Sequence, residues 1–179
     1  MIADIESYLR WFEGVNRRAI RDIGVLPSEA EGWKPTLGEG ERAWDIGTIV
    51  GHMAASRLYF ASAYRDEGWI MNRWDHDTSR RASWIPALEV SAKLFREKLE
   101  GTPNEWLRRP IELIDEPERT ISGWRVLMMM AEHDVHHRSQ IDAYAGINGW
   151  PIEHIFGRTA EQVTSEREAQ IKKHAFGKH

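Results

Sequence analysis

The sequence predicts an all-α protein: a four-helix bundle followed by an additional C-terminal helix. Apolar residues recur at intervals of three and four along five segments, which is the period of an amphipathic helix. With 179 residues, of which 41% are hydrophobic, the chain can bury one substantial core but not comfortably two. We therefore expect a single domain over residues 1–179, in which the helices bury their apolar faces against one another.

The first three helices follow from apolar stripes and from the residues that precede them. The first stripe comprises Ile2, Ile5, Tyr8, Phe12, Val15, Ala19 and Ile23. Residues 25–44 are rich in Gly and Pro, which predicts a long loop. Asp45 is the expected N-cap of the second helix, and Ser83 is that of the third. Pro86 is compatible with the third helix because we place it in the first turn, where backbone N–H groups have no helical partner.

The C-terminal part of the chain predicts two further helices and a short hairpin. Residues 111–114 and 119–121 could pair as that hairpin across a turn that contains Pro. A fourth helix is expected over about 122–144, and a run of Gly and Asn ends it. Trp150-Pro151 is expected to open a shorter fifth helix, and residues 172–179 should be frayed.

The composition excludes several classes of site and partner. The chain has no cysteine, so it has neither disulfides nor thiolate metal sites, which fits a reducing compartment. A net charge of −4 gives no electrostatic reason to bind nucleic acid. No apolar run approaches the ~20 residues of a membrane helix, and the charged start of the chain does not resemble a signal peptide. We therefore expect a cytoplasmic protein that binds neither nucleic acid nor membranes.

Two histidines of the fourth helix could bind one metal ion. His133 and His137 are four residues apart, so they lie on one face of the helix, with Cβ atoms roughly 5–6 Å apart. That face adjoins the apolar stripe of the helix, whereas His136 points about 100° away from His137. On its own, such a pair is more often two core histidines that are satisfied by hydrogen bonds.

His52 on the second helix strengthens the metal interpretation. It borders the apolar stripe of that helix and is flanked by small residues that leave space around an imidazole, namely Gly51, Ala54, Ala55 and Ser56. Three neutral imidazoles suit Zn²⁺, Ni²⁺ or Fe²⁺ and leave at least one coordination position open. Without a metal, each buried ring nitrogen would need another partner or lose its hydration.

Two segments resemble the metal-bearing helices of the DinB-like superfamily, which includes proteins classed as YfiT-like metal-dependent hydrolases and as thiol-dependent S-transferases. They are AWDIGTIVGHMAASRLYF and EHDVHHRSQIDAYAGINGW, and the resemblance extends over essentially the whole chain. Residue by residue, the ligands of the family fall on His52, His133 and His137. Members more often have Gly where this chain has Ser139. The resemblance implies an up-down-down-up bundle, a nickel or zinc ion and frequently a homodimer.

The other polar residues of these segments are weaker candidates. Glu132 and Asp134 flank His133 but face away from the His133/His137 line, so we expect them to be solvated or to bond a neighbouring helix. The fourth ligand is therefore expected to be solvent or a small anion. We expect His76 on a loop surface, and we expect no ligand role for His154, His174 or His179.

Two classes of function remain open. The first is an enzyme that acts on a small molecule: thiol S-transfer is the first choice, and metal-assisted hydrolysis is the second. Because the chain has no cysteine, the thiol would be a low-molecular-weight cofactor such as bacillithiol, mycothiol or glutathione. The second is a stress-related bundle that binds a metal or small ligand without turnover. An open coordination position beside a cavity lined by Trp and Tyr would favour the enzyme.

Overall fold

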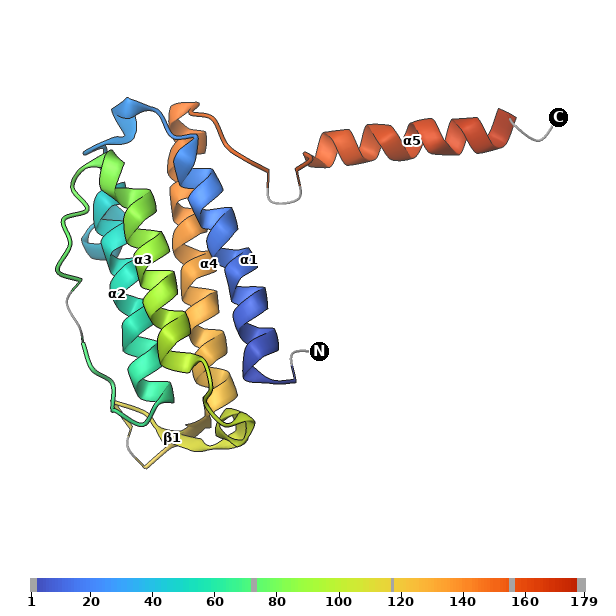
Figure 1. Cartoon of the computed structure of the whole chain (residues 1–179). Helices are drawn as coiled ribbons and strands as arrows, with labels where there is room; N and C mark the ends of the chain where they lie inside the picture. The colour runs from blue at the N-terminus through green and yellow to red at the C-terminus, as the bar shows by residue number, and fades with distance from the viewer. Residues whose placement is uncertain (1–2, 72–73, 117, 155–156, 177–179) are drawn as a thin grey trace.

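The computed structural model describes residues 3–71, 74–116, 118–154 and 157–176, and four long helices of this part form a bundle. Figure 1 shows them side by side, with a fifth helix that extends away from one end of the bundle. The all-α prediction is thus confirmed. Ile2, the first residue of the predicted apolar stripe, lies outside the described residues. The bundle helices are α1 (Ile5–Gly24), α2 (Ile46–Tyr64), α3 (Arg81–Leu99) and α4 (Gly123–Asn148).

The four helices run up, down, down and up. Helix α1 contacts α3 and α4, and α2 contacts the same two helices, so that α1 and α2 lie diagonally across the bundle. Because α2 and α3 run in the same direction, the connecting segments 65–71 and 74–80 return along the bundle from the end of α2 to the start of α3 (Figure 1). Arg81 Nε donates to the carbonyl of Leu26 at 2.8 Å, which fixes the start of α3 beside the end of α1.

Side-chain caps begin three of the helices. Asp45 accepts a hydrogen bond from the backbone N–H of Thr48 at 2.7 Å, as predicted, and Asp4 and Ser122 cap α1 and α4 in the same way. The predicted cap Ser83 is wrong, because α3 begins at Arg81. The Arg81 N–H donates to the distant carboxylate of Glu31 at 2.8 Å, a cap that the local sequence does not reveal.

The start of α3 and the end of α4 differ from the prediction. Because α3 begins at Arg81, Pro86 lies in its second turn and not in the first. Helix α4 continues past Gly146 to Asn148 and ends at Gly149, which adopts the left-handed conformation (φ 65°) that favours glycine.

The predicted hairpin is present at the end of the bundle where α3 ends and α4 begins. Strand β1 (Pro110–Glu112) pairs antiparallel with β2 (Thr120–Ser122), with Ile111 opposite Ile121. Both strands are shifted relative to the prediction, and Pro117 of the intervening turn lies outside the described residues. Ile111 is buried against the core, which anchors this end of the bundle.

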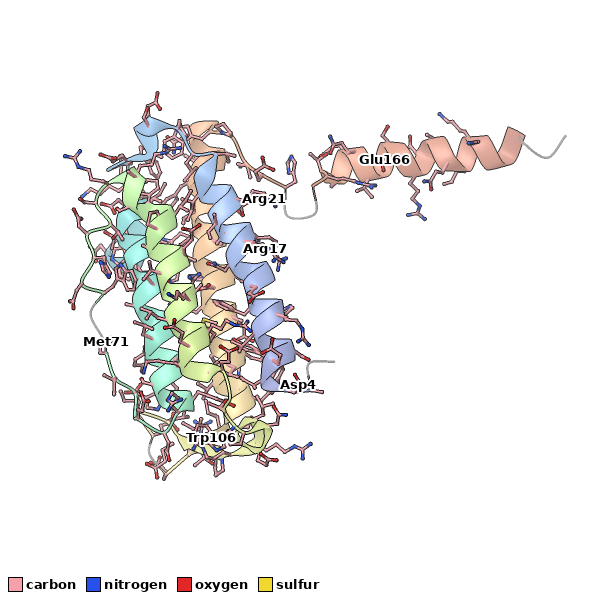
Figure 2. All side chains as sticks on the ribbon, in the orientation of Figure 1. Asp4, Arg17, Arg21, Met71, Trp106 and Glu166 are labelled. Carbon is pink, nitrogen blue, oxygen red and sulfur yellow. The ribbon has the colours of Figure 1, made fainter. Side chains whose placement is uncertain are left out.

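The fifth helix begins later than predicted. Helix α5 spans Ala160–Phe176, whereas residues 150–154 are not helical, so Trp150-Pro151 does not open it. Trp150 packs against Trp33 instead, with ring centroids 5.5 Å apart. Residues 160–173 are exposed, as Glu166 illustrates in Figure 2. Their many Glu, Gln, Arg, Lys and Ala residues favour a helix even without tertiary packing. The prediction that the chain frays from residue 172 is therefore wrong for residues 172–176, which are helical. Residues 177–179 lie outside the described part of the chain.

A polar layer divides the core of the bundle. One hydrophobic cluster, with Tyr8, Phe60 and Phe95, fills the end near the hairpin, and a second, with Ile49 and Trp84, fills the other end. Between them lie buried polar residues from all four helices, including Asn16, Arg57, Ser91 and Asp134. The layer places charge and hydrogen-bonding capacity at mid-bundle, directly beside the predicted histidines.

No helix among the described residues is both long and apolar enough to span a membrane.

Candidate metal centre

Helices α2 and α4 bring His52, His133 and His137 together in the middle of the bundle. The Nε2 atom of His133 lies 2.9 Å from Nε2 of His52 and 3.2 Å from Nε2 of His137. Four ligands around an ion at ~2.0–2.1 Å are separated by about 3.3 Å in a tetrahedron. The spacing of the three ring nitrogens therefore fits a single divalent ion.

The hydrogen bonds of Gln140 orient the ring of His137. The Gln140 amide nitrogen donates to the carbonyl of Glu41 at 2.8 Å and to the hydroxyl of Tyr144 at 2.9 Å, so the amide oxygen is the atom that faces His137. This oxygen lies 3.0 Å from His137 Nδ1 and can only accept. Nδ1 therefore carries the proton, and Nε2 directs its lone pair at the other two histidines, as in a metal-ligating imidazole.

All three imidazoles are neutral near pH 7. Burial, with a smaller contribution from nearby His137, lowers the pKa of His52 below its ordinary value. Burial and the neighbouring histidines lower the pKa of His133 to about 3. Burial also lowers the pKa of His137, although Gln140 and Glu41 act in the opposite direction. Neutral imidazole is the form that binds a metal ion, so the cluster is already in its binding state.

Aromatic side chains wall the histidines on both sides. The Trp44 ring lies edge-on to His52 at 4.9 Å and is nearly parallel to His137 at 6.2 Å. The Phe60 ring lies 6.0 Å from that of His133. These rings keep the site partly dry, which strengthens electrostatic interactions with any charge bound there.

Asp134 and Glu132 have different surroundings. Glu132 is exposed and pairs with Arg125 at 2.8 Å, as expected for a solvated residue. Asp134 is buried and accepts two hydrogen bonds from Arg57, at 3.2 and 2.7 Å. Arg57 also donates to the carbonyl of Leu88 and to Ser91 on α3. The pair thus joins α2, α3 and α4 directly behind the histidines.

Sequence reasoning missed Arg57 and Glu41. Arg57 stands between Met53 and Phe60 on the apolar stripe of α2, and this interruption was a usable signal. Glu41 belongs to the 3₁₀ turn Gly40–Ala43, which precedes α2. Its carboxylate lies 3.1 Å from His136 Nε2 and 4.0 Å from His137 Nε2. No sequence spacing links this loop to α4.

Two other histidines of the described residues, His76 and His154, lie on the surface. His76 is exposed on the loop between α2 and α3, beside Trp74, as predicted. His154 is exposed, and its backbone carbonyl accepts a hydrogen bond from Arg21. The side chain of His174 and the whole of His179 lie outside the described structure.

Comparison with known proteins identifies the family. No curated protein matches the chain. A crystal structure of a DinB-like protein from Bacillus cereus superimposes with a TM-score of 0.68 at 15% identity, over 86% of this chain and 99% of the other. One from Bacillus subtilis gives 0.60 at 17% identity, over 81% and 96%. These likenesses support the fold. Residues 1–170 match the sequence profile of the DinB family, and the chain therefore belongs to that family.

Proposed function

We propose that the protein holds one divalent metal ion through Nε2 of His52, His133 and His137 and is a metal-dependent enzyme that acts on a small molecule. The observation that carries this proposal is that Nε2 of His52 and Nε2 of His137 lie 2.9 and 3.2 Å from Nε2 of His133. In a metal-free protein an Nε2–H of His52 or His133 would have to bridge these nitrogens, whereas a cation would accept a lone pair from all three. Imidazole ligands favour Zn²⁺ or Ni²⁺, with Fe²⁺ as a further option.

The first choice of reaction is thiol S-transfer, and the second is metal-assisted hydrolysis. A bound ion of this kind supplies a Lewis acid that favours the deprotonated form of a thiol or of water. Because the three imidazole ligands are neutral, the ion would keep its full positive charge. The chain has no cysteine, so the thiol would come from a cofactor such as bacillithiol, mycothiol or glutathione. The histidines would orient it, and the aromatic walls would limit the access of water.

A cavity that shares Phe60 with the surroundings of His133, although none of the three histidines lines it, supports an enzyme over a storage protein. It measures about 330 Å³ and is lined by Tyr59, Phe60, Trp69, Leu113, Ile114, Asp115, Glu116 and Met129. Met129 precedes His133 by one helical turn, and Phe60 contacts both the cavity and the His133 ring. Such an apolar, aromatic hollow beside a Lewis acid suits the acceptor substrate of a transfer reaction.

The alternative is a binding protein without turnover. The proximity of Glu41 to His137 favours it, because a permanent fourth protein ligand would close the position that a substrate needs. We also propose a cytoplasmic homodimer, because the family resemblance implies a dimer and the lack of cysteine fits a reducing compartment. Light scattering tests the dimer separately from the metal.

The functional test uses protein loaded with Co²⁺. If the fourth coordination position of the ion is exchangeable, added thiols should produce a sulfur-to-metal charge-transfer band. A panel of thiols and electrophiles should then reveal turnover. His154→Ala provides a matched control, because His154 is exposed and distant from the cluster. A cobalt spectrum that ignores every thiol and small anion would favour the binding protein.

A further inference from the structure

The Glu41 carboxylate lies at the open edge of the histidine cluster. Its Oε1 atom is 3.1 Å from Nε2 of His136 and 4.0 Å from Nε2 of His137. Its side chain remains 48% exposed and that of His136 64% exposed. A surface ion pair of this kind adds little stability by itself, so stability does not account for the position of Glu41.

The backbone that carries Glu41 is fastened to α4. The Gln140 amide nitrogen donates to the carbonyl of Glu41 at 2.8 Å, and the Tyr144 hydroxyl donates to that of Arg42 at 3.3 Å. The same Gln140 side chain accepts from His137 Nδ1. A single amide therefore connects a candidate ligand with the turn that presents Glu41, so the two cannot move independently.

Local geometry brings the turn back towards the cluster. Gly38 and Gly40 have φ angles of 111° and 57°, conformations that residues with a side chain rarely adopt. Trp44, which follows the turn, packs on both His52 and His137. The turn is thus held against the cluster from both ends.

The geometry assigns Glu41 to the three-histidine centre and not to a second site. Glu41, His136 and His137 also form a possible ligand set of their own. However, His137 Nδ1 is engaged by Gln140, so only its Nε2 is available, and this atom faces His52 and His133. A separate site would be left with two ligands, whereas Glu41 would complete four around the first.

We propose that Glu41 is the exchangeable fourth ligand of the metal centre, and that His136 positions it. This inference rests on the proposed function. The carboxylate lies 4.0 Å from His137 Nε2 but falls outside 4.8 Å of the ring nitrogens of His52 and His133. The turn therefore has to move it inward by roughly 1.5 Å or more to reach ligand spacing. There it would offset one of the two positive charges that the imidazoles leave. One oxygen can bind the ion while His136 holds the carboxylate, since ligating carboxylates are themselves usually hydrogen-bonded. An incoming thiol or anion would take the place of the Glu41 carboxylate, and His136 would keep its hydrogen bond to Glu41.

The test measures two affinities in metal-free protein that is then loaded with Co²⁺. In Glu41→Ala, we expect Co²⁺ binding to weaken by about tenfold or more, with an altered visible spectrum. We expect thiocyanate and 2-mercaptoethanol to bind the cobalt protein more tightly than in the wild type, because nothing has to be displaced. His136→Ala should change both affinities in the same directions but less, and His136→Gln, which keeps a donor, should restore them. Glu132→Gln is the matched control and should behave as wild type.

Four results would overturn the inference. An unchanged cobalt spectrum and unchanged affinities in Glu41→Ala would leave only a surface ion pair. Weaker binding of both Co²⁺ and thiocyanate would mean that Glu41 merely supports the loop. If wild-type protein does not bind Co²⁺, or if His137→Ala binds it equally well, the proposed metal centre itself fails, and this inference fails with it.

Discussion

The buried pair of Arg57 and Asp134 should contribute strongly to the integrity of the bundle. Both side chains are 0% exposed, and Arg57 also donates through Nη1 to the carbonyl of Leu88 and to Ser91. Replacing Asp134 by the isosteric leucine removes the only carboxylate that Arg57 contacts among the described residues. An uncompensated buried guanidinium costs about 3–5 kcal/mol. Because a domain typically has 5–15 kcal/mol of stability, we expect Asp134→Leu to fold but to be severely destabilised.

Urea unfolding, followed by tryptophan fluorescence in the presence of a chelator, measures this cost without a contribution from metal. The double variant Arg57→Met/Asp134→Leu should regain most of the loss, since apolar residues of similar volume need no compensation. Glu132→Gln, on the exposed face of the same helix, should change stability by less than about 0.5 kcal/mol. The reasoning fails if Asp134→Leu costs under about 1 kcal/mol, or if the double variant is as unstable as the sum of its single variants.

Three further predictions concern metal, pH and packing. Metal at a thousandfold excess over its dissociation constant should stabilise the fold by ~4 kcal/mol. Chelation should therefore lower the melting temperature of the wild type but not that of His137→Ala. An unchanged wild-type melting temperature would show that metal binding is not coupled to folding. Without metal, the unfolded chain protonates its histidines first, because the folded pKa values are depressed, that of His133 to about 3. Stability should therefore fall as the pH drops below about 6.5, and His133→Gln should flatten this dependence; a pH-independent melting temperature would contradict the reasoning. Gly47→Ala would place a methyl group 2.3 Å from the carbonyl oxygen of Thr78, so calorimetry should show a loss of about 1–3 kcal/mol. The exposed Gly24→Ala, whose methyl group would meet only Ile85 at an ordinary 3.7 Å, should show no such loss.

The sequence was sufficient for features that depend on local periodicity. The apolar stripes located the four bundle helices, and Asp45 capped the second helix as expected. The i, i+4 spacing placed His133 and His137 on one inner face. The sequence did not reveal contacts between distant segments. Glu31, in the loop after the first helix, caps the third helix, and this helix therefore begins at Arg81 and not after Ser83.

In the candidate site, too, the local features could be predicted from the sequence and the long-range contacts could not. His52 was identifiable because it borders an apolar stripe among small residues. Glu41 was not, since its approach to His137 depends on how the loop folds back onto α4 through Gln140. The start of the fifth helix was misjudged because Trp150 packs onto Trp33, a tertiary contact that keeps residues 150–154 out of the helix.

Titration of metal-free protein with Zn²⁺ or Co²⁺ in a calorimeter tests the central claim most directly. Three converging imidazoles predict one tight equivalent per chain. This binding should be lost or greatly weakened in His52→Ala, His133→Ala and His137→Ala, and kept in His154→Ala. The absence of a stoichiometric event in wild type, or binding of equal strength in the three histidine variants, would contradict the claim that these residues form a metal centre.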